Sequence, residues 1–161
     1  ESFIRQKGGQ FEKDPRADSY MNEITSRRFS AAGTEKFSLS SPRIEFFEGS
    51  SVLTIVEPRF LTQQALGKPL NLQATQGQLN SDLGVLDLDG NVRADINSNG
   101  DLAVLTTERL TYLIDSNIAK TDSSFKLLSP HSDISGSGLH IDLNKETFII
   151  KSNVRVIHEP I

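Results

Sequence analysis

The sequence predicts an all-β domain in which repeated hairpins form two facing antiparallel sheets. From Ser19 onward, apolar and polar residues alternate or short β-branched runs recur, as they do in half-buried strands. Short clusters rich in Asn, Asp, Ser and Gly separate these runs and provide the turns. No segment has a strong helical pattern, because the best candidate, TQQALGKPL, is interrupted by Gly67 and Pro69.

Chain length and composition favour one thin domain. The 161 residues are enough for a single domain, and a hydrophobic content of 36% with a mean hydropathy of −0.32 argues against a large compact core. Residues 1–18, ESFIRQKGGQFEKDPRAD, are polar, charged and broken by glycine and proline. We therefore expect a flexible lead-in over residues 1–18 and one β domain over residues 19–161.

The predicted strands follow one another with short turns between them. The first spans about Tyr20 to Ser30, and the clearest is LHIDL, in which Leu139, Ile141 and Leu143 point to the same face. In the last strand one face is continued by Phe148, Ile150, Val154 and Val156. The remaining predicted strands are, in order, FSLSS, RIEFFE, SVLTIVE, GVLDLDG and LTYLID.

A weak internal repeat organises these strands into hairpins. The first strand of each unit centres on Ile44, Leu79, Leu110 and Leu139, so successive units are 35, 31 and 29 residues apart. A hairpin of this size cannot bury its apolar face alone, so the units must stack. Stacked units give two facing layers in an elongated sandwich or roll.

Four glycines are assigned structural roles in this roll: Gly33, Gly90, Gly136 and Gly138. The last two lie in ISGSGLHIDL, which we interpret as a strand entry where glycine permits a bulge, a sharp bend or a close backbone approach. A phosphate-binding loop would need a helix N-terminus after GSG, and a predicted strand follows instead.

The residues suggest no enzyme, cofactor or metal site. The segment DINSNGD resembles the first half of a calcium loop, but Thr106 occupies the place of the bidentate carboxylate. The histidines His131, His140 and His158 lack metal-ligand spacing, and no serine has a nucleophile-elbow motif. The net charge of −4 argues against a nucleic-acid-binding protein, and the absence of cysteine excludes thiol chemistry and disulfides.

The order of several motifs resembles the LptC family of lipopolysaccharide-export proteins over about residues 19–160. The matching motifs are the GNV turn after an alternating strand, LTTERLTY, I-x-G-x-GL-x-x-D and a terminal SNVR. The bridge protein LptA and the N-terminal domain of LptD share the same roll. Family members normally begin with a membrane-spanning helix, whereas no apolar run here reaches the roughly 18 residues that a span needs.

The resemblance implies an elongated β-jellyroll in the periplasm, anchored to the inner membrane by a helix that precedes Glu1. It implies that the chain receives lipopolysaccharide from the ATP-binding-cassette transporter LptB-LptF-LptG and passes it to LptA. Leaving one dozen-carbon acyl chain in water costs on the order of 10 kcal/mol, so a carrier needs a long apolar trough. The expected lining residues are Ile44, Phe46, Leu86, Leu88, Leu110, Tyr112, Leu139, Ile141, Leu143, Phe148, Ile150, Val154 and Val156.

Partner proteins are expected at the two open sheet edges, where unpaired backbone groups can add a strand. The N-terminal edge, facing the transporter, contains Tyr20, Ile24 and Phe29. The C-terminal edge, facing LptA, contains Phe148, Ile150, Val154 and Val156.

Three other interpretations are compatible with the same letters. The apolar residues could fill a closed core in an adaptor domain that binds only proteins. The chain could also be the soluble bridge protein LptA, which would have a cleaved signal peptide instead of an anchor. A carbohydrate-binding sandwich is disfavoured, because the chain has no Trp and only Tyr20 and Tyr112 as tyrosines.

Overall fold

The computed structural model describes residues 2–6, 12–14, 17–29, 35–62, 69–98 and 101–158, and the side chains of residues 37–62, 69–97 and 101–157. Every regular element in these ranges is a β-strand, so the predicted all-β class is confirmed. The described segments contain no helix that is long and apolar enough to span a membrane.

The chain forms thirteen strands in these ranges. The first seven are β1 (Ser2–Gln6), β2 (Glu12–Asp14), β3 (Ala17–Phe29), β4 (Glu35–Phe46), β5 (Val52–Val56), β6 (Arg59–Thr62) and β7 (Leu70–Gln73). The others are β8 (Gln76–Asn80), β9 (Val85–Ser98), β10 (Asp101–Leu113), β11 (Ile118–Ser129), β12 (Ser132–Asp142) and β13 (Thr147–His158).

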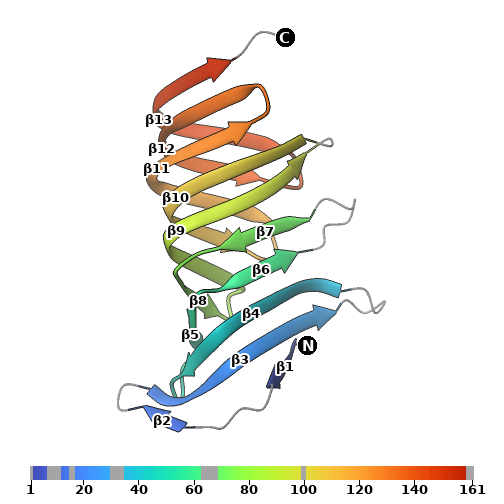
Figure 1. The fold of residues 1–161 in the computed structure, drawn as a ribbon, viewed down its shortest axis with the longest axis vertical. Coiled ribbons are helices and arrows are strands. Elements are labelled where there is room, and N and C mark those ends of the chain that lie inside the picture. Colours follow the sequence, from blue (N-terminus) through green and yellow to red (C-terminus); the bar gives the residue numbers. More distant parts are fainter. Residues whose placement is uncertain are drawn as a thin grey trace.

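All of these strands belong to one antiparallel sheet that is stacked along the long axis of the molecule (Figure 1). The order along the main path is β1-β3-β4-β5-β8-β9-β10-β11-β12-β13, and β6 and β7 form a second connection between β4 and β9. The N-terminal strands lie at one end of the roll and β13 lies at the other.

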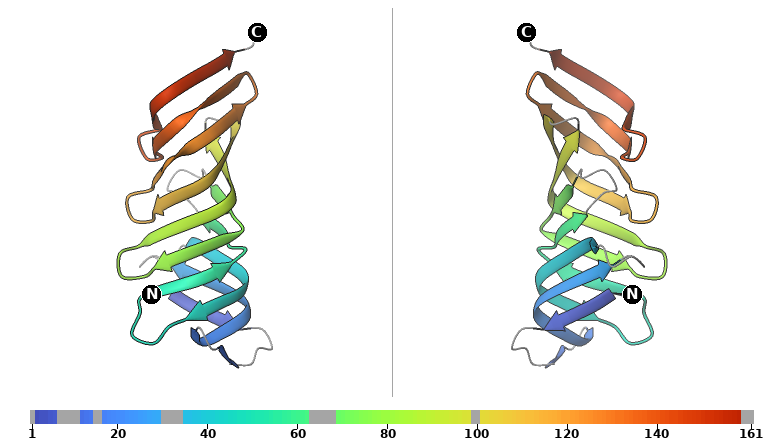
Figure 2. Two further views of the ribbon diagram at one scale, coloured as in Figure 1. Left: turned by 90° about the vertical axis from the view of Figure 1, so that its left-hand side faces the viewer. Right: turned by 90° about the vertical axis from the view of Figure 1, so that its right-hand side faces the viewer.

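The sheet folds over so that its two halves face each other, as the side views in Figure 2 show. The first half of β4 pairs with β6 and its second half with β5, while β9 pairs with β8 and then with β7. Register shifts mark the bends in the later strands, for example between Thr121 and Ser124 and between Ser135 and Ser137. The two predicted facing layers are therefore halves of one continuous sheet.

The core lies between the two layers. It is built from side chains that alternate along the strands, because successive residues of a strand point to opposite faces. Its buried members are Phe37, Leu39, Ile44, Ile55, Phe60, Leu70, Leu72, Leu86, Leu88, Val92, Ala94, Ile96, Leu105, Leu110, Tyr112, Ala119, Phe125, Leu127, Leu139, Ile141 and Leu143.

The N-terminal segment contains regular structure that the sequence did not predict. Two strands, β1 and β2, lie within residues 1–18, and both pair with β3, which begins at Ala17. The flexibility expected for residues 1–18 remains a prediction. The two strands gave no clear sequence pattern, because strand pairing uses backbone groups and needs few apolar side chains. The domain boundary at residue 19 remains a prediction.

The glycines of ISGSGLHIDL lie in the middle of β12 and not at a strand entry. They flank the bend of this strand, and Gly138 has a φ of +78°, which disfavours other residues. A Cβ on Gly138 would lie 2.9 Å from the Lys151 Cβ, and one on Gly136 would lie 2.9 Å from the Ile150 Cγ2. Gly90 also has a positive φ, in β9, while Gly33 lies outside the described residues.

Candidate functional site: the apolar interior

Two continuous rows of apolar side chains run the length of the interior. In each row, the residues on neighbouring strands lie directly opposite one another, where Cβ atoms are about 5 Å apart. We call the first row the Tyr112 wall. From β4 to β13, its members are Phe46, Leu53, Leu79, Leu86, Tyr112, Ala119, Ile141 and Phe148.

The second row, which we call the Phe60 wall, lies on the opposite layer. From β4 to β13, its members are Leu39, Phe60, Leu72, Ala94, Leu105, Leu127, Ile134 and Val156. Each wall crosses eight strands, and seven steps of about 4.8 Å give an apolar interior ~34 Å long. The hydrocarbon core of a bilayer is about 30 Å thick, so an acyl chain from one leaflet is shorter than this interior.

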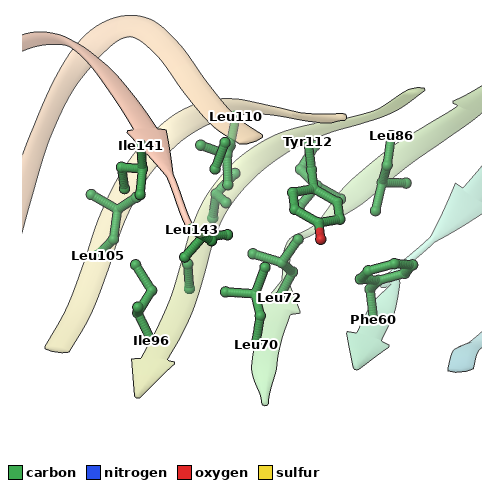
Figure 3. Close-up of a cluster of buried hydrophobic side chains, with 14 of the residues drawn as sticks. Phe60, Leu70, Leu72, Leu86, Ile96, Leu105, Leu110, Tyr112, Ile141 and Leu143 are labelled. Carbon is green, nitrogen blue, oxygen red and sulfur yellow. The ribbon is translucent and has the colours of Figure 1, made fainter. Parts of the chain in front are cut away.

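Aromatic rings join the two walls between their ends (Figure 3). The ring centroids of Phe60 and Tyr112 are 5.5 Å apart, and Phe37 also packs against Phe60, with a centroid distance of 5.0 Å. Such tilted aromatic pairs add about 0.5–1.5 kcal/mol to the burial of the rings. The walls are therefore in contact in this structure, and a guest molecule would have to part them.

Tyr112 is held in place by polar partners at its outer end. Its hydroxyl donates a hydrogen bond to Asn117 Oδ1 at 2.5 Å, and Asn117 Nδ2 donates to Asn144 Oδ1 at 3.0 Å. Burial raises the pKa of Tyr112 to about 12, and a side-chain hydrogen bond with Thr62 offsets part of the increase. The phenol is thus neutral, and its network links the turn after β10 to the turn after β12.

The C-terminal end of the interior is open to solvent. Phe148 and Val156 continue the two walls on β13, but they are 39% and 55% exposed because β12 is the only described strand that pairs with β13. Their neighbours Ile149 and Ile157 point to the outer face and are each 59% exposed. Exposed apolar area of this kind is typical of a binding surface.

The structure places ten of the thirteen predicted lining residues in or against one apolar core cluster. Ile44, Leu86, Leu88, Leu110, Tyr112, Leu139, Ile141 and Leu143 are buried, and Phe46 and Ile150 are partly buried. Phe148, Val154 and Val156 are exposed, because nothing in the described chain stacks beyond β13. The role of all these residues in binding a lipid remains a prediction.

Most of the Phe60 wall was missing from the predicted lining. The sequence carries part of the signal, since Val92, Ala94 and Ile96 alternate with Arg93 and Asp95. The sequence does not show that β9 and β10 extend across both layers. This arrangement places the Phe60 wall opposite the Tyr112 wall.

The two predicted partner edges differ in the structure. β13 is a terminal strand of the described sheet, as predicted. The predicted N-terminal edge at Tyr20, Ile24 and Phe29 lies in β3, which pairs with β4 on one side. On its other side Ile24 pairs with Gln6 and Tyr20 with Glu12, so β1 and β2 cover this edge, contrary to the prediction.

The segment that resembles a calcium loop lies in strands where the structure describes it. Asp95 lies within β9, and its Oδ1 accepts a hydrogen bond from Arg93 Nε at 2.8 Å. This segment ends β9 and begins β10, where Ser98 pairs with Asp101. Within the described ranges, no group of three or more His, Cys, Asp or Glu residues is arranged to hold a metal ion.

Comparison with known families supports this architecture. Residues 5–159 match the model of the family described as "Lipopolysaccharide-assembly, LptC-related". The chain belongs to this family. Comparison of the LptC-family chain with curated protein sequences finds no significant match.

A solved structure shows the same fold. It is LptH from Pseudomonas aeruginosa, described as the LptA-homologous periplasmic component of the conserved lipopolysaccharide transport device. The likeness covers 77% of the LptC-family chain and 95% of LptH, with a TM-score of 0.65 and 12% sequence identity. The predicted jellyroll of the LptA type is thereby confirmed.

Proposed function

We propose that this LptC-family chain is a lipopolysaccharide carrier that holds acyl chains between the Tyr112 wall and the Phe60 wall. The observation that carries the proposal is the unbroken pair of apolar walls, which extend from β4 to the exposed end at β13. A chain of a dozen carbons gains on the order of 10 kcal/mol when it leaves water, at ~0.8 kcal/mol per CH₂. Parting the walls exposes their own apolar surface, which a lipid then covers.

The direction and the partners form a second part of the proposal. Lipopolysaccharide would come from the transporter LptB-LptF-LptG at the end formed by β1, β2 and β3 and would leave toward LptA at β13. Strand addition to β13 is favoured by a backbone edge that no described strand covers and by exposed apolar residues on both faces of β13. ATP hydrolysis by the transporter would drive the transfer.

We place this domain in the periplasm, tethered to the inner membrane by a helix encoded before Glu1. Family membership supports this placement. The coding sequence upstream of Glu1 tests the tether, because an apolar helix is expected there and a cleaved signal peptide would contradict it.

A closed-core adaptor is the second candidate, and the ring contact between Phe60 and Tyr112 favours it. The two functions differ in what the inner face of β13 binds. Phe148 faces inward opposite Ile141, whereas Ile149 faces outward opposite His140, and both are exposed. This neighbouring pair therefore offers a matched test.

The experiment places a photoreactive phenylalanine analogue at Phe148 or Ile149 and irradiates each protein with lipopolysaccharide. A carrier captures the lipid strongly from position 148 and weakly from position 149. Equal capture from both positions, or none from either, would favour the adaptor. Thermal unfolding of each variant provides the control for folding.

A further inference from the structure

A second row of side chains, on the outer face, combines positive charge with small polar residues. Opposite pairs on β9 to β13 place Arg93, Thr106, Lys126, Ser135 and Arg155 in a line. We call this line the basic row. Arg93, Thr106 and Lys126 each lie between two buried residues of their own strands, and Ser135 lies next to the buried Gly136. Arg155 precedes Val156, which continues the Phe60 wall, so the row points away from the apolar interior.

Along the basic row, long cationic side chains alternate with short hydroxyl side chains, and a groove follows this part of the outer surface. Cations on β9, β11 and β13 are separated by the short hydroxyl side chains of Thr106 and Ser135 on the strands between them. A groove of about 860 Å³ follows this row across the bend of the sheet, and its lining includes all five residues. A groove of this volume is large enough for a small-molecule ligand.

The charges in the groove are only partly neutralised within the described structure. The Arg93 Nε lies 2.8 Å from Asp95 Oδ1, but neither Lys126 nor Arg155 forms an ion pair among the described residues. Glu108 is the carboxylate of the lining, and its Oε2 accepts a hydrogen bond from the Asn91 backbone N–H at 2.9 Å. Two free cations thus flank Ser135, about 10 Å apart by the spacing of two strands.

We propose that this groove binds an anionic saccharide through the basic row. Phosphate or carboxylate groups would lie between the cations, which form charge-assisted hydrogen bonds with such groups. The hydroxyl and amide side chains of the lining, such as Ser137 and Asn153, suit sugar hydroxyls. The best ligand carries anionic groups about 10 Å apart, to match cations on every second strand.

The inference deepens the proposed function, on which it rests for the source of the saccharide. If acyl chains occupy the interior, the polar part of the same lipid must stay in water. The basic row would hold that part on the outer face of the layer whose inner face carries the Phe60 wall. The groove is lined by residues that the structure describes, so saccharide binding to it can be tested without any acyl chain.

The experiment measures binding of the phosphorylated oligosaccharide that remains after complete deacylation of lipopolysaccharide, by calorimetry at low salt. The double variant Lys126→Glu, Arg155→Glu is expected to bind about 100-fold more weakly, a factor of ten for each charge-assisted contact. Added salt should weaken binding to the unmodified protein, because these exposed charges are screened. Glu108→Gln should bind several-fold more tightly, since it removes the repelling carboxylate and keeps an acceptor for Asn91.

The matched control is Lys120→Glu, Lys145→Glu, which changes the net charge equally outside this groove. The control should lose less than threefold. Equal losses in both double variants, or no binding of the deacylated saccharide to the unmodified protein, would overturn the groove assignment. Capture of intact lipopolysaccharide at Phe148 reports separately on the proposed carrier function.

Discussion

Removing the hydroxyl of Tyr112 tests whether the two walls meet in a dry interior. In Tyr112→Phe the ring remains against Phe60, but the hydrogen bond to Asn117 Oδ1 is lost. A buried hydrogen bond contributes about 1 kcal/mol, and leaving its acceptor unpaired adds to the cost. We expect the free energy of unfolding to fall by about 1–2 kcal/mol at pH 8, which lowers the Tm by about 2–8 °C for a chain of this size.

The pH dependence of stability makes this prediction specific. The folded-state pKa of Tyr112 is raised from 10.0 to about 12, so its neutral form is favoured by folding. The corresponding stabilisation is fully present below pH 10 and is lost as the pH rises through 12, by about 3 kcal/mol at 1.36 kcal/mol per pKa unit. By pH 12 the wild-type protein should therefore have lost about 2 kcal/mol more than Tyr112→Phe, because the folded-state phenol is half ionised at that pH.

The assay is urea unfolding at a series of pH values between 8 and 12, for both proteins. Taking the difference between them removes the titration of lysine and of the other tyrosine, Tyr20. Absorbance at alkaline pH gives a second readout, because only two tyrosines contribute and one should ionise late. Parallel stability curves, together with ordinary ionisation of both tyrosines, would refute the burial of Tyr112 between the walls.

Other substitutions test the remaining parts of the structure. Gly138→Ala should destabilise the domain by about 1–3 kcal/mol, and more than Gly49→Ala. Both glycines have positive φ, but only at Gly138 would the added Cβ crowd a neighbouring side chain. Equal losses in urea unfolding would contradict this. Leu105→Ala should lower the free energy of unfolding by about 2–5 kcal/mol, whereas Thr106→Ala, at the outward-facing neighbour, should lower it by less than about 0.5 kcal/mol. Similar losses in both variants would contradict the assignment of Leu105 to the Phe60 wall. Deletion from Thr147 onward, which removes β13, should abolish binding to LptA in a pull-down while the truncated domain still unfolds cooperatively; retained binding would assign the contact to another surface.

The sequence predicts faces well and pairing partners poorly. The alternation of Leu139, Ile141 and Leu143 is a local property of one strand, and the structure confirms that these side chains share the inner face. Phe148 follows the same alternation, but its exposure depends on whether another strand lies beyond β13. Whether another strand pairs with β13 depends on the whole sheet, and the alternation within one strand does not reveal it.

The pairing of the N-terminal strands also could not be predicted from the sequence. The pairing of Ser2–Gln6 with β3 rests on backbone hydrogen bonds, so the polar composition of the first residues gave no strand signal. The basic row was equally hidden, because Arg93, Lys126 and Arg155 are far apart in the sequence and meet only through the register of five strands. Scattered charges in a sequence can therefore form an ordered line on a sheet.

A fully buried position in the interior provides the most direct test of the carrier function. Ile141 is fully buried on the Tyr112 wall, and its neighbour His140 points to the outer face of the same strand. A photoreactive residue at position 141 should capture lipopolysaccharide, and one at position 140 should not, if acyl chains enter between the walls. Capture at position 140 but not at position 141, in variants that fold normally, would contradict the apolar trough.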